Sequence, residues 1–496
     1  MDTMEKLDLL RQAKAKIQQG GGEEKQSKQR SGGGLTARDR VLALLDEGSF
    51  IELGALISAK DGFTAADGVV TGYGTVDERL VYVYSQDATV MGGAVGEMNA
   101  EKICRIYDMA AKMGAPVVGM LDSCGVRVGE GIEAQAAMGK IFAAAAKVSG
   151  VVPTISLVLG NCAGGAALAA SMSDFVIINE KTGRLFVNGP SVIQSATGKK
   201  AAVDGKGSFA VSGNAHFIGA DDAACIASAR LLLSYLPSNN LSDAMVLECT
   251  DDLNRTSGAL ESLEGEYDIR TAIAEVVDDG AFMEVQAEYA KTAVVGFARL
   301  NGASVGIAAN QPKVDGGVLT GQAIEKIARF VRFCDCFNLP VVTFTDVDGF
   351  AVSASEEEWG LARKGARMLY AFAEATVPKV NVIVGKAYGS GYAVMNSKQL
   401  GADVVFAFPQ AEIAPLSSKT GVQLLYEDKL HEGKKREELE AAYKAVDASP
   451  LMAAAAGCVD DVIEPAETRS RVIAALEMLA SKRVSGVSRK HDNMPL

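Results

Sequence analysis

An internal duplication constrains this 496-residue sequence more than any other feature. Residues 101–125 read EKICRIYDMAAKMGAPVVGMLDSCG, and residues 325–349 read EKIARFVRFCDCFNLPVVTFTDVDG, without a gap between them. Each copy predicts an amphipathic helix that stops at a proline, followed by a buried strand that ends in an aspartate, Asp122 or Asp346. A repeated unit of this length indicates two copies of one fold.

The flanking segments recur in the same order. LLDEGSFIEL at 44–53 matches VVDDGAFMEV at 276–285, and VPTISLVLG at 152–160 matches VPKVNVIVG at 377–385. Alternation of strands and helices predicts α/β units with largely parallel sheets covered by helices.

The duplication also divides the chain, which is too long for one ordinary hydrophobic core. A polar stretch at 238–266 lies between the copies, and we expect an N-terminal domain of residues 1–255 and a C-terminal domain of residues 256–496. Residues 18–34 (QQGGGEEKQSKQRSGGG) have the composition of a linker, so we expect the ordered body to begin near Thr36.

Each copy carries a strand that runs into a small-residue turn and then a helix, GNCAGGA at 160–166 and GKAYGSG at 385–391. Such a turn leaves backbone N–H groups exposed at a helix N-terminus, where negative charge is favoured. A second donor is expected from Gly125-Val126 in the first copy and Gly349-Phe350 in the second. Two converging donors form an oxyanion hole. Glycines that merely allow close helix–strand packing are the alternative.

The sequence gives little support for nucleic-acid binding, for other catalytic motifs or for a metal site. A net charge of −13 without a basic cluster argues against nucleic acid. The sequence has no Walker loop and no H-E-x-x-H motif, and no G-x-S-x-G nucleophile elbow is recognised in it. His216, His431 and His491 stand beside no nucleophile and are expected at the surface or as caps. The scattered cysteines predict no metal site and fit reduced thiols in the cytoplasm, and no direct insertion into a membrane is predicted.

The sequence as a whole closely resembles the biotin-dependent acyl-CoA carboxyltransferase family, which includes propionyl-CoA carboxylase β-subunits and methylmalonyl-CoA decarboxylase α-subunits. The resemblance spans residues 36–483. It is carried by TARDRVLALLDEGSF, SQDATVMGGAVGEMNAEKI, DSCGVRVGEG, SGVVPTISLVLGNCAGGAA, YDIRTAIAEVVDDGAFMEV, ARFVRFCDCFNLPVVTF, ARMLYAFAEATVPKV, KAYGSGYAVM and GCVDDVIEPAETR.

The resemblance implies two tandem crotonase-type domains of ββα spiral architecture and carboxyl transfer between biotin and the α-carbon of a short acyl-CoA. The first copy would bind acyl-CoA, with the thioester oxygen near Gly164 and Gly165. The second would hold the ureido oxygen of biotin near Gly389, Ser390 and Gly391. Substrate contacts are expected at Gly125, Val126, Arg127, Ala163, Gly349, Phe350 and Ala393.

Partners follow from the same resemblance. No biotin-attachment domain is recognised in the sequence, so biotin would arrive on a separate carboxyl carrier protein, with a biotin carboxylase or a membrane decarboxylase subunit as a further partner. The family also implies a homo-oligomer, expected to be a hexamer, in the cytoplasm.

The sequence departs from the family pattern near both turns. DSCGVRVGEG replaces DSGGARIQEG, DGFAVS at 348–353 replaces PGFLPG, and Ala393 stands where propionyl-type members carry Asp. Acyl-chain choice is therefore open. A hydratase or isomerase without biotin, using Asp122, Glu130 or Glu133 as base, and a non-catalytic scaffold, suggested by Asp348 and Ser390, are the alternatives.

Overall fold

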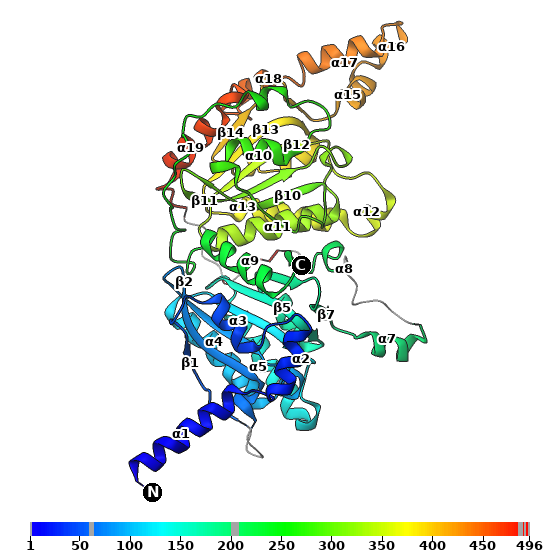
Figure 1. Cartoon of the computed structure of the whole chain (residues 1–496). Helices are drawn as coiled ribbons and strands as arrows, with labels where there is room; N and C mark the ends of the chain where they lie inside the picture. The colour runs from blue at the N-terminus through cyan, green and yellow to red at the C-terminus, as the bar shows by residue number, and fades with distance from the viewer. Residues whose placement is uncertain (1, 59–63, 200–207, 485–489, 491–492, 495–496) are drawn as a thin grey trace. The chain divides into compact units, whose positions relative to one another are not determined.

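The computed structural model divides into two compact units, Met1–Ser242 and Asp243–Leu496, each with a mixed sheet and covering helices (Figure 1). It describes all residues except 1, 59–63, 200–207, 485–489, 491–492 and 495–496. The division falls inside the polar stretch at 238–266, at Ser242 rather than at residue 255.

The sheet of the first unit has the strand order β1-β2-β3-β4-β5-β6-β8, with β7 paired to β5. β1, β2 and β3 are antiparallel, and every later pairing is parallel. The strands are β1 (Ile51–Glu52), β2 (Val69–Val76), β3 (Arg79–Gln86), β4 (Val117–Ser123), β5 (Thr154–Ala163), β6 (Phe175–Asn179), β7 (Arg184–Phe186) and β8 (Phe217–Gly219).

The sheet of the second unit repeats this topology, with the order β16-β14-β13-β12-β11-β10-β9 and β15 paired to β13. Its strands are β9 (Met283–Val285), β10 (Ala293–Leu300), β11 (Ala303–Asn310), β12 (Val341–Val347), β13 (Lys379–Tyr388), β14 (Val404–Ala407), β15 (Glu412–Ala414) and β16 (Asp461–Val462). The duplication predicted from the sequence is therefore confirmed strand by strand.

The helices also correspond between the units. In the first they are α1 (Thr3–Gln18), α2 (Glu23–Ser31), α3 (Ala37–Leu44), α4 (Glu97–Met113), α5 (Ile132–Val148), α6 (Gly165–Ser171), α7 (Pro190–Thr197), α8 (Ser208–Val211) and α9 (Asp222–Tyr235). In the second they are α10 (Ile269–Val276), α11 (Gly321–Cys336), α12 (Ala354–Glu358), α13 (Leu361–Glu374), α14 (Gly389–Val394), α15 (Ser418–Leu425), α16 (Glu427–His431), α17 (Arg436–Ala445), α18 (Pro450–Ala455) and α19 (Thr468–Leu479).

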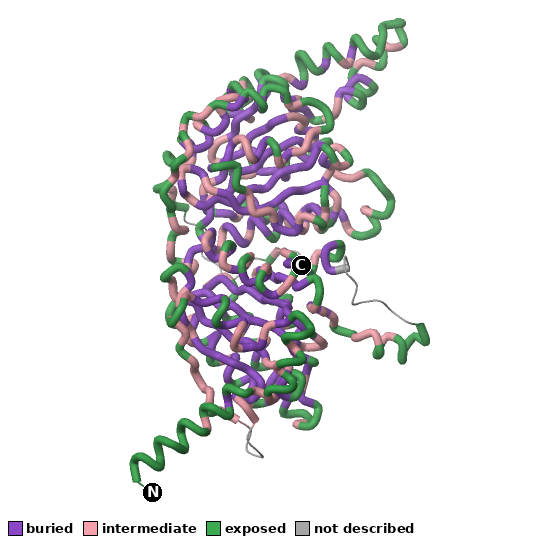
Figure 2. The backbone as a smooth tube through the Cα atoms, in the orientation of Figure 1, coloured by how far each residue is buried: buried purple, intermediate pink, exposed green. Residues whose placement is uncertain are grey.

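Each unit has its own core between its sheet and the helices that cover it. β4 and β12 are buried along their whole lengths, and buried residues, drawn in purple, run through the interior of each unit (Figure 2). α4 packs against the sheet through Ile103 and through Ile106 and Tyr107, which follow it by three and four residues on the same face. Gly114, in the left-handed conformation, ends that helix at the position where the sequence turns into β4. The packing of α4 and β4 thus fixes the position of Asp122 near the end of β4.

The interpretation of residues 18–34 as a linker is wrong. Residues 23–31 form α2, and the glycine segment before it is docked: Gly21 N donates to Thr89 Oγ1 (3.0 Å) and Lys25 Nζ donates to Thr89 O (3.3 Å). A Cβ on Gly21 would lie 1.9 Å from Thr89 O, so only glycine allows this approach. The composition of this segment predicts no apolar anchor, but hydrogen bonds to Thr89 hold it in place.

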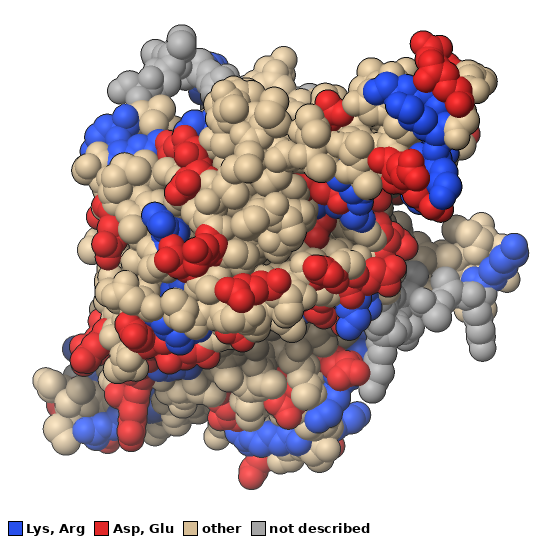
Figure 3. Space-filling view, turned by 90° about the horizontal axis from the view of Figure 1, so that it is seen from above, with Lys and Arg blue, Asp and Glu red and all other residues tan. Residues whose placement is uncertain are grey.

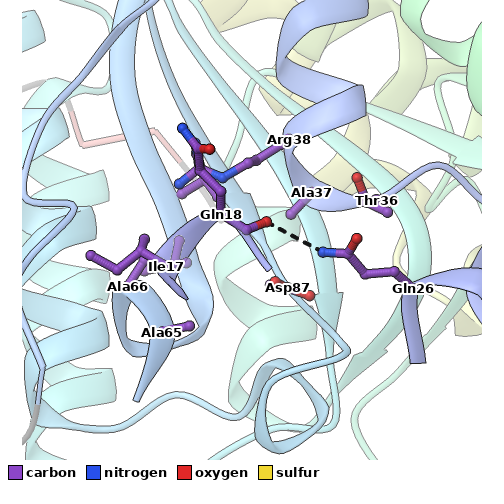
Figure 4. A pocket seen from close by; sticks show the side chains of 11 residues that line it. Ile17, Gln18, Gln26, Thr36, Ala37, Arg38, Ala65, Ala66 and Asp87 are labelled. Atoms are coloured by element: carbon purple, nitrogen blue, oxygen red, sulfur yellow. Dashed lines mark hydrogen bonds between the residues drawn. The ribbon is translucent and has the colours of Figure 1, made fainter. Parts of the chain in front are cut away.

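A small pocket lies between this N-terminal segment and the first sheet (Figure 4). Gln26 Nε2 donates to Gln18 O across its rim (3.5 Å), and Arg38, Thr36 and Asp87 also line it. None of the predicted site residues is among its lining residues.

Surface features complete the description. On the face drawn in Figure 3, Lys and Arg are interspersed with Asp and Glu. The helices α15, α16 and α17 extend away from the second sheet (Figure 1) and pack around their own small cluster, which includes Val422, Leu439 and Tyr443. Among the described helices, none is both long enough and apolar enough to cross a bilayer.

Candidate active site

In the first unit the predicted strand–turn–helix is present. β5 ends at Ala163 and α6 begins at Gly165. Gly164 between them has φ +59° and ψ −123°, a conformation reserved for glycine, and its N–H donates to Phe186 O (3.0 Å). The first hydrogen bond at the start of α6 runs from Ala167 N to Gly164 O (3.1 Å). The amides of Gly165 and Ala166 precede it in the chain. These first-turn amides are the donors that the helix itself leaves for a ligand.

In the second unit β13 leads into α14 in the same way. Gly389 opens the helix with φ +55°. Ser390 and Ala393 are exposed and lie three residues apart on one side of α14, whereas Gly391 is buried. A Cβ on Gly391 would lie 2.7 Å from Gly349 Cα, so glycine lets the turn meet the loop after β12. The structure therefore brings Gly349 and Gly391 together.

The loop after β4 approaches the first turn similarly, because a Cβ on Gly125 would lie 3.3 Å from Ala163 O. Gly125 N itself donates to Ser123 Oγ (3.2 Å). Val126 forms a parallel bridge with Val95, in which Val95 N donates to Gly125 O (2.8 Å) and Arg127 N donates to Val95 O (2.8 Å). That bridge does not use the Val126 amide. Val126 rather than Gly125 is thus the candidate for the second donor.

Phe350 has the equivalent position in the second unit. It forms a parallel bridge with Leu319, in which Leu319 N donates to Gly349 O (2.9 Å) and Ala351 N donates to Leu319 O (3.0 Å). The Phe350 amide is left out of this bridge as well. Both units therefore present the same two backbone elements, a helix N-terminus and a bridged loop.

Arg127 was expected to contact substrate, but its guanidinium is buried within the protein. Nη1 pairs with Asp67 Oδ1 (3.1 Å) and Glu130 Oε1 (2.7 Å), and Nη2 donates to Asp67 O and Ala94 O. These carboxylates raise its pKa against the opposing effect of burial, which is the largest single influence. Arg127 is placed to brace the loop, and direct substrate contact stays a prediction.

The carboxylates proposed as bases in a hydratase are mostly engaged elsewhere. Glu130 pairs with Arg127 and accepts from Glu97 N (2.8 Å) at the start of α4. Asp122 is buried and paired with Arg40. Glu133 alone among the three is exposed. This arrangement disfavours Asp122 and Glu130 as the base of a hydratase, because a base must be free to reach its substrate proton.

The histidines do not provide a base either. His216 was expected at the surface or as a cap, but it is buried, and its Nδ1 accepts from Val176 N of strand β6 (3.0 Å). His431 is exposed beside Glu427, and His491 lies outside the described residues. Across the part of the chain that the structure describes, no cluster of three or more His, Cys, Asp or Glu could hold a metal ion.

The sequence marked Asp122 and Asp346 as strand ends, and Asp122 also as a candidate base, yet both lie against the turns. Asp122 Oδ1 accepts from Asn161 N (3.2 Å), and Asp346 Oδ1 accepts from Lys386 N (2.9 Å). Burial raises the pKa of each carboxyl group, while Arg40 opposes the rise at Asp122 and the Lys386 amide opposes it at Asp346. The two aspartates occupy the same position in the duplicated segments, and this was the feature of the sequence that could have marked them as site residues.

Two equivalent strand–turn–helix elements in a duplicated α/β unit are suited to an enzyme that stabilises charge on carbonyl oxygens. Comparison with known proteins identifies the class of enzyme. The carboxyl transferase domain model matches residues 28–494, and the chain belongs to this family of carboxyltransferases.

The similarity extends over whole chains. The methylmalonyl-CoA decarboxylase subunit alpha of Veillonella parvula is 44% identical over 508 residues, covering 99% of this chain and 99% of the relative. The propionyl-CoA carboxylase carboxyltransferase subunit of Haloferax mediterranei is 44% identical over 515 residues, covering 100% of both. A transcarboxylase 12S crystal structure with methylmalonyl-coenzyme A and methylmalonic acid bound superposes with a TM-score of 0.97 at 41% identity over 100% of both chains. The predicted family and crotonase-type fold are confirmed.

Proposed function

We propose that this carboxyltransferase moves a carboxyl group between biotin on a separate carrier protein and the α-carbon of a short acyl-CoA, of the propionyl/methylmalonyl or acetyl/malonyl type. Whole-chain similarity to relatives named for propionyl-CoA and methylmalonyl-CoA supports this substrate class. The observation that carries the proposal is the pair of equivalent strand–turn–helix sites, one in each unit.

The two sites divide the work in this proposal. The acyl thioester oxygen lies near Gly164 and Gly165, where the first-turn amides of α6 stabilise the enolate oxygen that develops when the α-proton leaves. The second turn, at Gly389, Ser390 and Gly391, faces the ureido oxygen. Carrier-borne biotin would supply the carboxyl group and a ureido nitrogen able to exchange the α-proton. Backbone donors suffice for both oxygens, which agrees with the absence of a free histidine from either described turn.

Assembly and partners form part of the same proposal. The transcarboxylase 12S protein assembles as a hexamer, and we propose a homohexamer here. Exposed apolar side chains next to the site loops, Val128 and Ile132 in the first unit and Val352 and Trp359 in the second, are suited to burial in such an assembly. The partners are a biotin carboxyl carrier protein and either a biotin carboxylase or a membrane decarboxylase subunit, with the enzyme in the cytoplasm.

The experiment is to incubate the purified chain with carboxylated carrier protein and a panel of acyl-CoAs, and to identify products by mass. We expect a carboxylated acyl-CoA only when carboxylated carrier is supplied. Robust turnover of acyl-CoA without any biotin would contradict the proposal and favour a hydratase. Acyl-CoA binding without transfer to any member of the panel would favour the scaffold alternative.

A further inference from the structure

Both units contain the same irregularity in their parallel sheets, directly before the glycine-rich turn. In the first, the partner of β4 moves from Val158 at Leu121 to Cys162 at Ser123. In the second, the partner of β12 moves from Ile383 at Thr345 to Ala387 at Val347. The longer strand thus gains two residues relative to its neighbour, forming a bulge that redirects it into the turn.

An aspartate on the shorter strand occupies each bulge. Asp122 and Asp346 are 7% and 5% exposed, and each accepts the amide N–H of the residue that follows the bulge glycine. A Cβ on Gly160 would lie 2.1 Å from Asp122 Oδ1, and one on Gly385 would lie 2.3 Å from Asp346 Oδ2. The carboxylates therefore fill the space that any larger residue at these glycines would need.

The second oxygen of each carboxylate is anchored by a different group. Arg40 Nη1 donates to Asp122 Oδ2 (3.1 Å), and Arg40 Nη2 donates to Leu159 O (3.2 Å), so one guanidinium holds both the carboxylate and the bulged strand. In the second unit the hydroxyl of Tyr267 donates to Asp346 Oδ2 (2.8 Å). The anchors differ between the two units, so the element that the units share is the hydrogen bond from the backbone amide to the carboxylate.

We propose that Asp122 and Asp346 are positioning residues for carboxyl transfer, each fixing the bulge that aims the first-turn amides of α6 or α14 at its oxyanion. The inference rests on the proposed function. Neither carboxylate is a catalytic residue, because each contacts backbone behind the turn. Electrostatic stabilisation requires donors held within about 0.5 Å of their productive positions. A misplacement of about 1 Å costs on the order of 10²-fold in rate.

The test compares Asp346→Asn with Asp346→Leu in the full-length protein. Asparagine keeps an oxygen that accepts from Lys386 N and an amide group that can donate to the Tyr267 oxygen. Leucine keeps most of the volume and no acceptor. We expect asparagine to retain kcat for carboxyl transfer within about fivefold and leucine to lose about 10²-fold. The Kd for acyl-CoA, measured by calorimetry, should stay within about twofold in both because the first unit is untouched.

Gly385→Ala provides a second test that leaves the carboxylate in place. Its methyl group would displace Asp346 and should reproduce the kcat loss, again without a change in acyl-CoA Kd. Wild-type kcat in a folded Asp346→Leu or Gly385→Ala protein would overturn the inference. So would an asparagine variant as inactive as leucine, because loss through neutralisation alone indicates proton transfer by Asp346. A wild-type protein that fails to transfer carboxyl groups would instead contradict the proposed function.

Discussion

Lys386 Nζ lies 3.7 Å from Asp348 Oδ2, and both side chains are 43% exposed. The structure thus shows how this chain accommodates the carboxylate of Asp348 beside its second turn. The lysine offsets the charge of Asp348 close to where an oxyanion is proposed to form. An exposed pair of this kind contributes only about 0–1 kcal/mol to stability.

This relationship gives the first prediction. Asp348→Asn should leave the melting temperature almost unchanged but lower the KM for carboxylated carrier by about two- to fivefold, because Lys386 no longer shares its charge with a competing carboxylate. Steady-state kinetics at two ionic strengths measures the change, and the difference from wild type should shrink at high salt. Glu437→Gln, which neutralises an exposed carboxylate on α17, is the control. An increase in KM would show that Asp348 helps binding.

The division of labour between the turns gives the second prediction. Ser390→Phe should abolish carboxyl transfer while acyl-CoA still binds, because Ser390 is exposed on α14 and a bulky ring there covers the second turn. In the first unit, a Cβ on Gly165 would lie 2.7 Å from Met138 Cγ, so it would collide with α5. Gly165→Ala should therefore weaken acyl-CoA binding by tilting the first turn of α6.

Met138→Ala supplies a matched control for that variant. Shortening Met138 makes room for the new methyl group, so the double variant should recover acyl-CoA affinity relative to Gly165→Ala alone. Calorimetry with acyl-CoA and decarboxylation of carboxylated carrier separate the two halves of the reaction. If Ser390→Phe and Gly165→Ala lose the same half, the proposed division is wrong.

A third prediction concerns Arg40, which is 1% exposed and bridges Asp122 (3.1 Å) and Asp222 (2.9 Å). Arg40→Met removes the cation and leaves buried carboxylates without a counter-charge, which costs about 3–5 kcal/mol of unfolding free energy. Arg38→Met, which breaks the less buried pair with Glu52, should cost clearly less. Urea unfolding of both variants gives the comparison, and equal losses would contradict the assignment of Arg40 as the central charge of this network.

The fourth prediction is a pH dependence at Lys326. Its Nζ donates to the carbonyls of Gln286, Tyr289 and Ala293, and burial lowers its pKa from 10.5 to about 8. Between pH 8 and 10.5 the unfolded chain binds the proton more tightly than the folded protein does. This group's contribution to stability therefore rises with pH in that window and is lowest below pH 8.

The measurement is the unfolding free energy of wild type minus that of Lys326→Met at a series of pH values. This difference should increase from about pH 8 to about pH 10. Lys291→Met is the control, because Lys291 is 53% exposed and pairs with Glu288 on the surface, so its difference should be flat. A difference that falls over the same range would show that the buried amine needs its charge to satisfy the three carbonyls.

Local patterns in the sequence predicted much of this protein. The duplicated helix–proline–strand–aspartate segments, the two glycine-rich turns and the family motifs depend on residues close together in the chain, where periodicity and backbone preference act directly. These patterns predicted the α/β units, their correspondence and the positions of Gly164 and Gly389.

The tertiary structure decided which groups hold those turns in place. Arg40 meets Asp222 across 182 residues, Tyr267 meets Asp346 across 79, and Gly21 meets Thr89 across 68. Arg127 likewise is buried and holds the loop after β4, because its guanidinium pairs with Asp67, which lies 60 residues earlier in the chain. Such pairings depend on strand order and on the bulges in β5 and β13, which place distant backbone and side-chain atoms within hydrogen-bonding distance, and no local pattern specifies which distant residue will arrive there.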